Sequence, residues 1–229
     1  MKEKKKNYII KKHTKKMNRI VSYVVLAVVS FATLQAGSKP TTLRQALKND
    51  FYIGTALNRG QYLGTDEKAF NLVTKQFSAI VAENCMKSEK LQPREGEFFF
   101  DDADKFVAYG QKNKMWITGH TLIWHSQTPR WFFVDSEGKE VSKEVLIERM
   151  KKHIHTVVGH YKGKVKGWDV VNEAIEDNGE WRKSKFYKII GPEFIKLAFQ
   201  FAHEADPKAE LYYNDYSMAN PGRRSGVVK

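Results

Sequence analysis

The sequence of 229 residues contains one cysteine, Cys85, so it can form no intrachain disulfide, and a fold that is exported must depend on core packing. It also contains no glycine-rich phosphate loop, no serine-centred elbow and no cysteine–histidine pairing. The usual sequence signatures of nucleotide binding and of Ser or Cys nucleophiles are therefore missing. Acidic residues are few as well, since 26 Asp and Glu face 39 Lys and Arg.

The resulting formal charge of +13 is concentrated at the amino end. Residues 1–36 hold eight Lys, one Arg and one Glu, or +8, which leaves +5 for the remaining residues. That remainder has no basic–aromatic repeat and no zinc-ligand spacing, so we expect no nucleic-acid binding. Apolar residues make up 41% and aromatic residues 13% of the chain, which favours a folded domain over a disordered one.

Long hydrophobic runs are also lacking. The longest, residues 20–34, is shorter than the roughly 20 residues that a spanning helix needs. It follows a basic segment and ends close to the small residues Ala36 and Gly37, which is the layout of a signal peptide. We therefore expect residues 1–36 to be a basic extension and signal peptide, residues 37–229 to be the catalytic part, and the mature protein to be secreted or periplasmic. The alternative is a membrane-surface protein that keeps its lysine-rich segment.

From Thr41 onward, short β-rich runs alternate with longer amphipathic segments. This alternation is typical of parallel βα units in a single α/β domain. The predicted strands are 52–57, 79–84, 115–124 (in its first half), 167–173 and 210–216. The predicted helices are 67–75, 103–113, 143–161 and 192–205.

The helix predicted over 143–161 has a clear apolar stripe and a start signal. Ser142 is the expected N-cap, because its hydroxyl can accept a hydrogen bond from a first-turn amide. Three histidines fall mostly on the polar side, and their spacing is not the His-Glu-x-x-His form of a zinc site, so no metal is implied. The stripe consists of Val145, Ile147, Met150, Ile154, Val157 and Val158, and the histidines are His153, His155 and His160.

Polar or aromatic side chains follow every predicted strand. Five strands that present such side chains at the same end describe one face of a barrel, whereas an open doubly wound sheet concentrates them at one switch point. The sequence therefore predicts a barrel. The side chains in question are Asn58 and Arg59, residues 83–87, His120 with Trp124 and His125, Asn172 with Glu173, and residues 214–216.

The segment 168–173, Trp-Asp-Val-Val-Asn-Glu, is the most informative. A glutamate after a strand most often caps the next element or is solvated. Here, however, Glu173 stands at the end of an apolar run typical of a buried strand, and the residue before it, Asn172, has an amide side chain. Asn172 can hold a sugar hydroxyl, and a carboxyl group at a barrel strand end suits the protonation of a glycosidic oxygen. We interpret Glu173 as a catalytic carboxylate.

Several ordered blocks support this interpretation, and through them residues 41–229 resemble glycoside hydrolase family 10, the retaining endo-1,4-β-xylanases. The blocks are Glu-Asn-Cys-Met-Lys at 83–87, Pro93 and Gly96 followed by Phe98, Phe100, Ala103 and Asp104, Gly-His-Thr-Leu-Ile-Trp-His-Ser-Gln at 119–127 with Pro129 and Trp131, the segment 168–173, and Asn-Asp-Tyr at 214–216. Ser217 departs from the family's commoner asparagine.

The resemblance implies a (β/α)8 TIM barrel, of which about the first five βα units are in this chain. It implies xylan or xylo-oligosaccharides as substrate, no cofactor, and a monomer when the barrel is complete. Glu173 would be the proton donor and general acid/base, with Tyr216 near the cleavage point. The residues implied to bind xylose units are Glu83, Asn84, Lys87, His120, Trp124, Gln127 and Asn172.

Structural interpretations of these residues remain open. Lys87 can be a solvated charge at a helix start, His120 a hydrogen-bonded core histidine, and Trp124 a packing residue. For Asp215 we favour a structural role over that of a second carboxylate, and Arg59 and Asp102 are interpreted as surface or loop-fixing residues.

A retaining mechanism needs a nucleophilic carboxylate about 5 to 5.5 Å from the acid/base. In the resembled family this group follows the seventh strand, which we expect to lie beyond residue 229. The 229-residue polypeptide is therefore expected to be inactive by itself. The alternative function is that of a non-catalytic fragment or pseudoenzyme that binds xylo-oligosaccharides.

Overall fold

The computed structural model describes residues 41–228, so the expectations for residues 1–36 lie outside the described part. The chain divides into two units, Met1–Thr41 and Thr42–Lys229, and every described helix and strand belongs to the second. Within the described residues, no helix combines the length and apolarity that crossing a membrane requires.

All five predicted strands are present and form one parallel sheet. Their order in the sheet, β1-β2-β3-β4-β5, is also their order in the chain. Strand β3 is longer than predicted, since it continues past its first half through a cis His120–Thr121 peptide and an irregularity in its pairing with β4. The strands are β1 Gly54–Leu57, β2 Ala79–Ala82, β3 Trp116–Trp124, β4 Gly167–Asn172 and β5 Glu210–Asn214.

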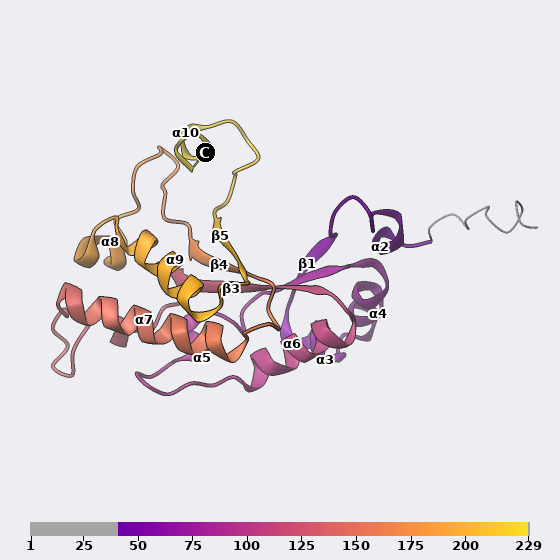
Figure 1. The fold of residues 1–229 in the computed structure, drawn as a ribbon, viewed down its shortest axis with the longest axis horizontal. Helices are drawn as coiled ribbons and strands as arrows, with labels where there is room; N and C mark the ends of the chain where they lie inside the picture. Colours follow the sequence, from indigo (N-terminus) through magenta and orange to yellow (C-terminus); the bar gives the residue numbers. More distant parts are fainter. Residues whose placement is uncertain (1–40, 229) are drawn as a thin grey trace, which may run out of the picture. The chain divides into compact units, whose positions relative to one another are not determined.

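The four predicted helices are also present, within a few residues of the predicted ends: α4 Glu67–Gln76, α6 Asp101–Lys112, α7 Lys143–His160 and α9 Phe194–Ala205. Short helices lie between them: α2 Leu43–Ala46, α3 Arg59–Leu63, α5 Ser88–Leu91, the 3-10 turn η1 Arg130–Phe132, α8 Lys185–Ile190 and α10 Arg223–Val228. Helices α6, α7 and α9 pack against the sheet, and α7 also packs against α9, whereas α4 packs against α2 and α3 (Figure 1).

Helix α7 confirms one expectation and corrects two others. The Ser142 side chain accepts a hydrogen bond from the Val145 amide, as expected of an N-cap. Val145, predicted in the apolar stripe, is exposed, and its neighbour Leu146 is buried instead. His153, expected on the polar side, is fully buried. The rest of the predicted stripe is confirmed, since Met150, Ile154, Val157 and Val158 are all fully buried.

The core between β3 and β4 depends on a close approach of Trp168 to Gly119. The two residues are register partners on neighbouring strands, and Trp168 is fully buried. A Cβ atom at position 119 would lie 2.2 Å from Trp168 Cε3, so only glycine fits there. This packing fixes the two strands whose carboxyl ends carry His120, Trp124 and Glu173.

Candidate active site

Glu173 lies directly after β4 in a left-handed backbone conformation, with φ of 55°. This conformation is uncommon for residues other than glycine and persists only where surrounding contacts hold it. Two backbone contacts do so here. The Glu173 amide donates to the Asn214 carbonyl at 2.9 Å, and Arg182 Nε donates to the Glu173 carbonyl at 2.7 Å.

The Glu173 carboxylate is directed towards β3. Its Oε2 atom accepts a hydrogen bond from Trp124 Nε1 at 3.0 Å and lies 4.0 Å from His125 Nε2. Burial, with a smaller contribution from nearby Arg182, lowers the pKa of His125. His125 is therefore largely neutral at pH 7, and the Trp124 indole is the principal fixed partner of the carboxylate.

Lys87 lies over the Trp124 ring, with Nζ 4.9 Å from the ring centroid. Nζ donates to Gln127 Oε1 at 2.6 Å and to Asn84 Oδ1 at 3.2 Å. Lys87 is only 9% exposed, so it is not the solvated helix-start charge of the structural interpretation, although it does precede α5. Burial lowers its pKa, and the negative charges around it partly oppose this effect.

Gln127 joins the same cluster from the loop after β3. Its Nε2 atom donates to Glu89 Oε1 at 3.2 Å and to Asn84 Oδ1 at 3.4 Å. Like Glu173, it has a left-handed backbone, with φ of 48°. Two of the four such non-glycine residues in the described part of the chain thus lie in the candidate site.

His120 points from β3 to β4, where its Nδ1 atom lies 2.8 Å from Asp169 Oδ2. Both side chains are mostly buried, at 18% and 13% exposure. Because Asp169 occupies Nδ1, Nε2 is the ring nitrogen left for a ligand. His120 is thus a hydrogen-bonded histidine, as the structural interpretation holds, and its other nitrogen still suits substrate binding.

Asn172, the last residue of β4, is buried between the neighbouring strands. In the orientation of its side-chain amide that satisfies both ends, the Asn172 oxygen accepts from Trp124 Nε1 at 3.1 Å. The Asn172 nitrogen then donates to the Asn214 carbonyl at 3.2 Å. Asn172 therefore links the ends of β3, β4 and β5 beside Glu173.

Two of the sequence-predicted residues, Tyr216 and Glu83, make no direct hydrogen bond to this cluster, although the negative charge of Glu83 raises the pKa of Lys87 against the effect of burial. Tyr216 is 42% exposed and stacks on the Arg224 guanidinium, whose Nη2 donates to the Tyr216 hydroxyl at 2.6 Å. Its link to Glu173 is indirect, since Arg182 Nη2 lies 3.4 Å from the same hydroxyl. Glu83 is exposed, and its carboxylate has no hydrogen bond or ion pair to any residue that the structure describes.

Asp215 has the contacts of a structural residue. Its carboxylate accepts hydrogen bonds from the Tyr213 hydroxyl at 2.5 Å and the Tyr216 amide at 2.9 Å, and it pairs with Arg224. The side chain is fully buried. A carboxylate so enclosed does not attack a sugar.

Sequence reasoning missed two residues with direct contacts here, Asp169 and Arg182. Asp169 has a usable signal, because a carboxylate within an otherwise apolar strand requires a partner. Arg182 has none, since it lies in a loop whose path is set by tertiary contacts. The exposed Arg59 side chain links the start of α3 to the first turn of α6, with Nε 3.1 Å from both carboxylate oxygens of Asp102, as expected of a surface residue.

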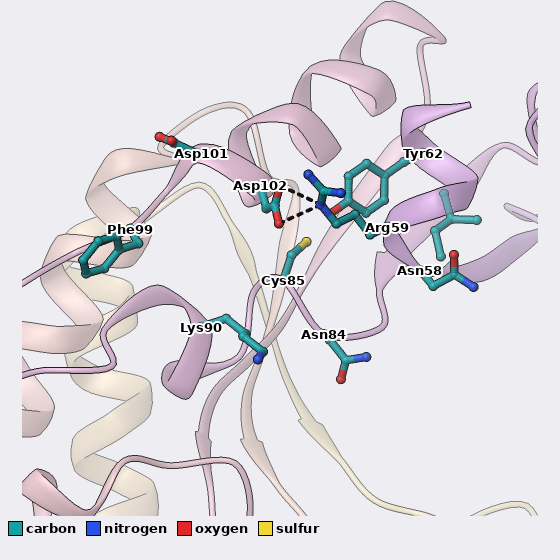
Figure 2. Close-up of a pocket in the computed structure, with 10 residues that line it drawn as sticks. Asn58, Arg59, Tyr62, Asn84, Cys85, Lys90, Phe99, Asp101 and Asp102 are labelled. Carbon is teal, nitrogen blue, oxygen red and sulfur yellow. Dashed lines mark hydrogen bonds and ion pairs between the residues drawn. The ribbon is translucent and has the colours of Figure 1, made fainter. Parts of the chain in front are cut away.

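The space directly beside Glu173, between Trp124, His125 and Phe186, is only about 10 Å³. A hollow of about 520 Å³ opens elsewhere, at the ends of β1 and β2, and shares Asn84 with the cluster (Figure 2). We locate the chemistry at Glu173, despite the size of the hollow, because the fixed carboxylate is there. No group of three His, Cys, Asp or Glu in the described residues has the arrangement of a metal site.

The model of glycosyl hydrolase family 10 matches residues 42–229. Endo-1,4-beta-xylanase A of Xylanibacter ruminicola is 57% identical over 188 residues, which are 82% of this chain and 51% of that protein. Endo-1,4-beta-xylanase of Geobacillus stearothermophilus is 49% identical over 193 residues, 81% of this chain and 56% of that protein. The chain thus spans about half the length of these curated relatives.

Solved structures of xylanases have the same fold over most of this chain. Xylanase 10B from Thermotoga petrophila RKU-1, in complex with xylobiose, superposes with a TM-score of 0.78 at 40% identity, over 84% of this chain and 58% of that one. A GH10 endoxylanase from a sugarcane soil metagenome gives 0.77 at 47% identity, over 81% of this chain and 54% of that one. The five parallel βα units observed here are therefore part of a (β/α)8 barrel fold, as the sequence predicted.

Proposed function

Because the chain belongs to glycosyl hydrolase family 10, we propose that this protein is an endo-1,4-β-xylanase that cleaves internal bonds of xylan with retention. The observation that carries the proposal is the Glu173 carboxylate, held by the Trp124 indole beside the cluster of Lys87, Asn84 and Gln127. Xylanase relatives at 49–57% identity over the same residues support it.

In the proposed reaction Glu173 first donates its proton to the glycosidic oxygen of the leaving sugar. It then acts as general base towards the water that resolves the glycosyl-enzyme. The ammonium of Lys87 and Nε2 of His120 supply hydrogen bonds to sugar hydroxyls on either side of Trp124, and Asn172 supplies one next to Glu173. Trp124 offers a ring face for a sugar and at the same time fixes the carboxylate.

The nucleophile of this mechanism is a second carboxylate, and we assign that role to no residue of this chain. We therefore propose that a polypeptide of these 229 residues binds xylo-oligosaccharides but does not hydrolyse them. Sequencing the coding DNA through and past codon 229 tests this point. A reading frame that continues to a glutamate at the seventh strand end would supply the nucleophile.

The test of the function is hydrolysis of xylan by the product of the full reading frame, with Glu173→Gln as the comparison. We expect the glutamine variant to keep oligosaccharide binding and to lose turnover on unactivated substrate. Wild-type turnover retained by the variant would remove Glu173 from the mechanism. Release of xylo-oligosaccharides at ordinary enzyme rates by the 229-residue polypeptide would show that a second carboxylate lies within it.

A second candidate function is non-catalytic binding of xylo-oligosaccharides. It is favoured by the assembly of Asn84, Lys87, Gln127 and His120 within the described residues, without an assigned nucleophile. Binding without cleavage by the full reading-frame product would support it over the first proposal.

We also propose that the protein is exported. The support is the basic segment followed by the apolar run at 20–34, which has the layout of a signal peptide. N-terminal sequencing of the protein from its native cells tests this, since a mature end near residue 37 indicates removal and an end at Met1 or Met17 indicates retention.

A further inference from the structure

The amino ends of the five parallel strands lie at the opposite end of the sheet from Glu173, and this end is strongly basic. The segments that lead into the strands are 44–53, 77–78, 112–115, 162–166 and 206–209. Together these segments, the basic end, hold seven Lys, one Arg and two Asp, or +6. All the described residues hold 28 basic and 25 acidic side chains, or +3, so the rest of the described part is net negative.

The lysines of the basic end have no acidic partners. All seven are exposed, and none forms an ion pair with a residue that the structure describes. Lys162 and Lys166 donate only to backbone carbonyls. Unpaired like charges repel one another, and an external anionic surface would remove that repulsion. The seven are Lys48, Lys112, Lys114, Lys162, Lys164, Lys166 and Lys208.

Two hollows open at the basic end and share Tyr52 and Lys114. The first, of about 350 Å³, is also lined by Lys48 and Asp50, and the second, of about 420 Å³, by Lys164. Asp50 is the only acidic side chain in the lining of either hollow. A lining of this charge suits anionic groups such as phosphates rather than neutral sugars.

Exposed aromatic rings accompany these lysines. Phe51 and Tyr52 are 61% and 62% exposed, and the Tyr52 ring centroid lies 5.0 Å from that of Trp116. Aromatic rings beside lysines are typical of membrane-interface segments, because the rings enter the boundary between headgroups and acyl chains while the ammonium groups attract anionic lipids. This combination favours a lipid surface over a soluble acidic polysaccharide, which offers no apolar layer to the rings.

The sequence ahead of the basic end has the same character. Residues 1–36 hold nine Lys and Arg, and the apolar run 20–34 ends ten residues before Arg44. While that run is at a membrane, during export or if it is retained, the basic end is the first part of the fold that follows it in the chain. Because the seven lysines belong to the folded part, they remain when residues 1–36 are removed.

We propose that the basic end docks on the surface of an anionic phospholipid membrane. Lys48, Lys114 and Lys164 attract the lipid phosphates, and Phe51 and Tyr52 enter the interface. Since Glu173 follows the carboxyl end of β4, docking through the amino ends leaves the candidate active site open to substrate. The inference does not depend on the proposed function, because it uses no residue of that site.

The test compares two triple variants of the 229-residue chain that have the same net charge and the same residues 1–40. Co-sedimentation with vesicles of phosphatidylglycerol and phosphatidylcholine measures the partition coefficient of each protein. The variant of the basic end carries Lys48→Gln, Lys114→Gln and Lys164→Gln. The matched control removes exposed lysines of α4, α8 and α9 that have no ion pair among the described residues, through Lys68→Gln, Lys188→Gln and Lys196→Gln.

We expect the variant of the basic end to bind these vesicles about tenfold more weakly than the wild type, and the control to stay within about twofold of it. On vesicles of phosphatidylcholine alone the two triple variants should bind alike, because that surface has no net charge. Phe51→Ala should weaken binding to the anionic vesicles about threefold and leave binding to dextran sulfate, a soluble polyanion, unchanged.

Equal binding of the two triple variants to anionic vesicles would overturn the proposal. Equal losses on vesicles and on dextran sulfate, with no effect of Phe51→Ala on either, would make the basic end a general polyanion site and would overturn it as well. Every substituted side chain is exposed, so the variants should fold, which circular dichroism checks. Hydrolysis of xylan tests the proposed function separately, and neither result decides the other.

Discussion

His120 Nδ1 lies 2.8 Å from Asp169 Oδ2, and the two residues are register partners across β3 and β4. The carboxylate binds Nδ1 and so orients the ring with Nε2 as the nitrogen left for a ligand. Thr121 Oγ1 also donates to the Asp169 carbonyl at 2.8 Å, so the backbone of the strand pair is held at the same position. The orientation of the His120 ring on β3 is thus set by a residue of β4.

The substitution Asp169→Asn should remove the carboxylate that orients the His120 ring. We expect xylotriose binding to the 229-residue chain to weaken about fivefold to tenfold, because one charge-assisted hydrogen bond that orients His120 is lost. Nitrogen NMR of the imidazole should show a change in the Nδ1–H tautomer population. Glu137→Gln, at an exposed turn carboxylate, is the control. An unchanged tautomer and affinity would mean that Asp169 does not position His120.

The left-handed backbone of Glu173 should impose a measurable cost on stability. Glu173→Gly and Glu173→Ala both remove the carboxylate and its bond to Trp124, and they differ only in tolerance of φ near 55°. We expect the glycine variant to be about 1 kcal/mol more stable than the alanine variant. Urea unfolding of the two proteins measures the difference. Equal stabilities would indicate that the loop relaxes when the side chain is removed.

His153 should make the fold acid-sensitive. Burial lowers its pKa to about 3, whereas the unfolded chain titrates near 6.5. Between these values the unfolded state binds a proton that the folded state does not, so the free energy of unfolding falls as the pH falls from about 6.5. The loss from this residue between pH 7 and pH 5 is on the order of 2 kcal/mol.

His153→Gln isolates that contribution, because glutamine keeps a polar side chain between Ser88 and Gln92 and does not titrate. Urea unfolding at pH 5 and pH 7 should show a smaller difference for the variant than for the wild type, even if the variant is less stable at both. The same pH dependence in both proteins would mean that His153 is protonated in the folded state.

Cys85 should be chemically inert in the folded protein. Burial raises its pKa to about 11, and the thiolate is the reactive form. We expect slow reaction with a disulfide reagent at pH 8 in the folded state and rapid, stoichiometric reaction in urea. Rapid labelling without denaturant would show instead that the thiol is ionised, or that the segment after β2 opens readily.

The inner strands β2, β3 and β4 were predictable because they are largely buried parallel segments and read as apolar runs, whereas the outer strands β1 and β5 are only partly buried. The single-turn helices α3 and α5 were not predicted, since their ends are set by side-chain contacts. The Asn58 side chain and Gln61 form a reciprocal capping box at the start of α3, and His153 bonds to Ser88 and Gln92 at the two ends of α5. In α5 these contacts join residues more than 60 positions apart and leave no periodic signal, whereas the Asn58–Gln61 box of α3 is local and could have been recognised from the sequence.

In the candidate site, too, some residues could be predicted from the sequence and others could not. Glu173 and Asn172 could be selected from one hexapeptide, because strand and carboxylate are adjacent in sequence. The burial of Lys87 could not, since Gln127 and Trp124, which enclose it, come from about 40 residues further along the chain. The α7 stripe was predicted correctly from Met150 onward and failed only in the first turn, where packing buries Leu146 and leaves Val145 exposed.

The order β1-β2-β3-β4-β5 repeats the order of the chain. Each strand after the first therefore needs only the strand synthesised just before it as a pairing partner. During translation the sheet can lengthen by one βα unit at a time, and the newest strand then serves as the template for the next. Each pairing still joins residues 25 to 49 positions apart, from Gly54 with Ala79 to Thr118 with Gly167, so the crossover helix has to form or dock before each new strand can pair.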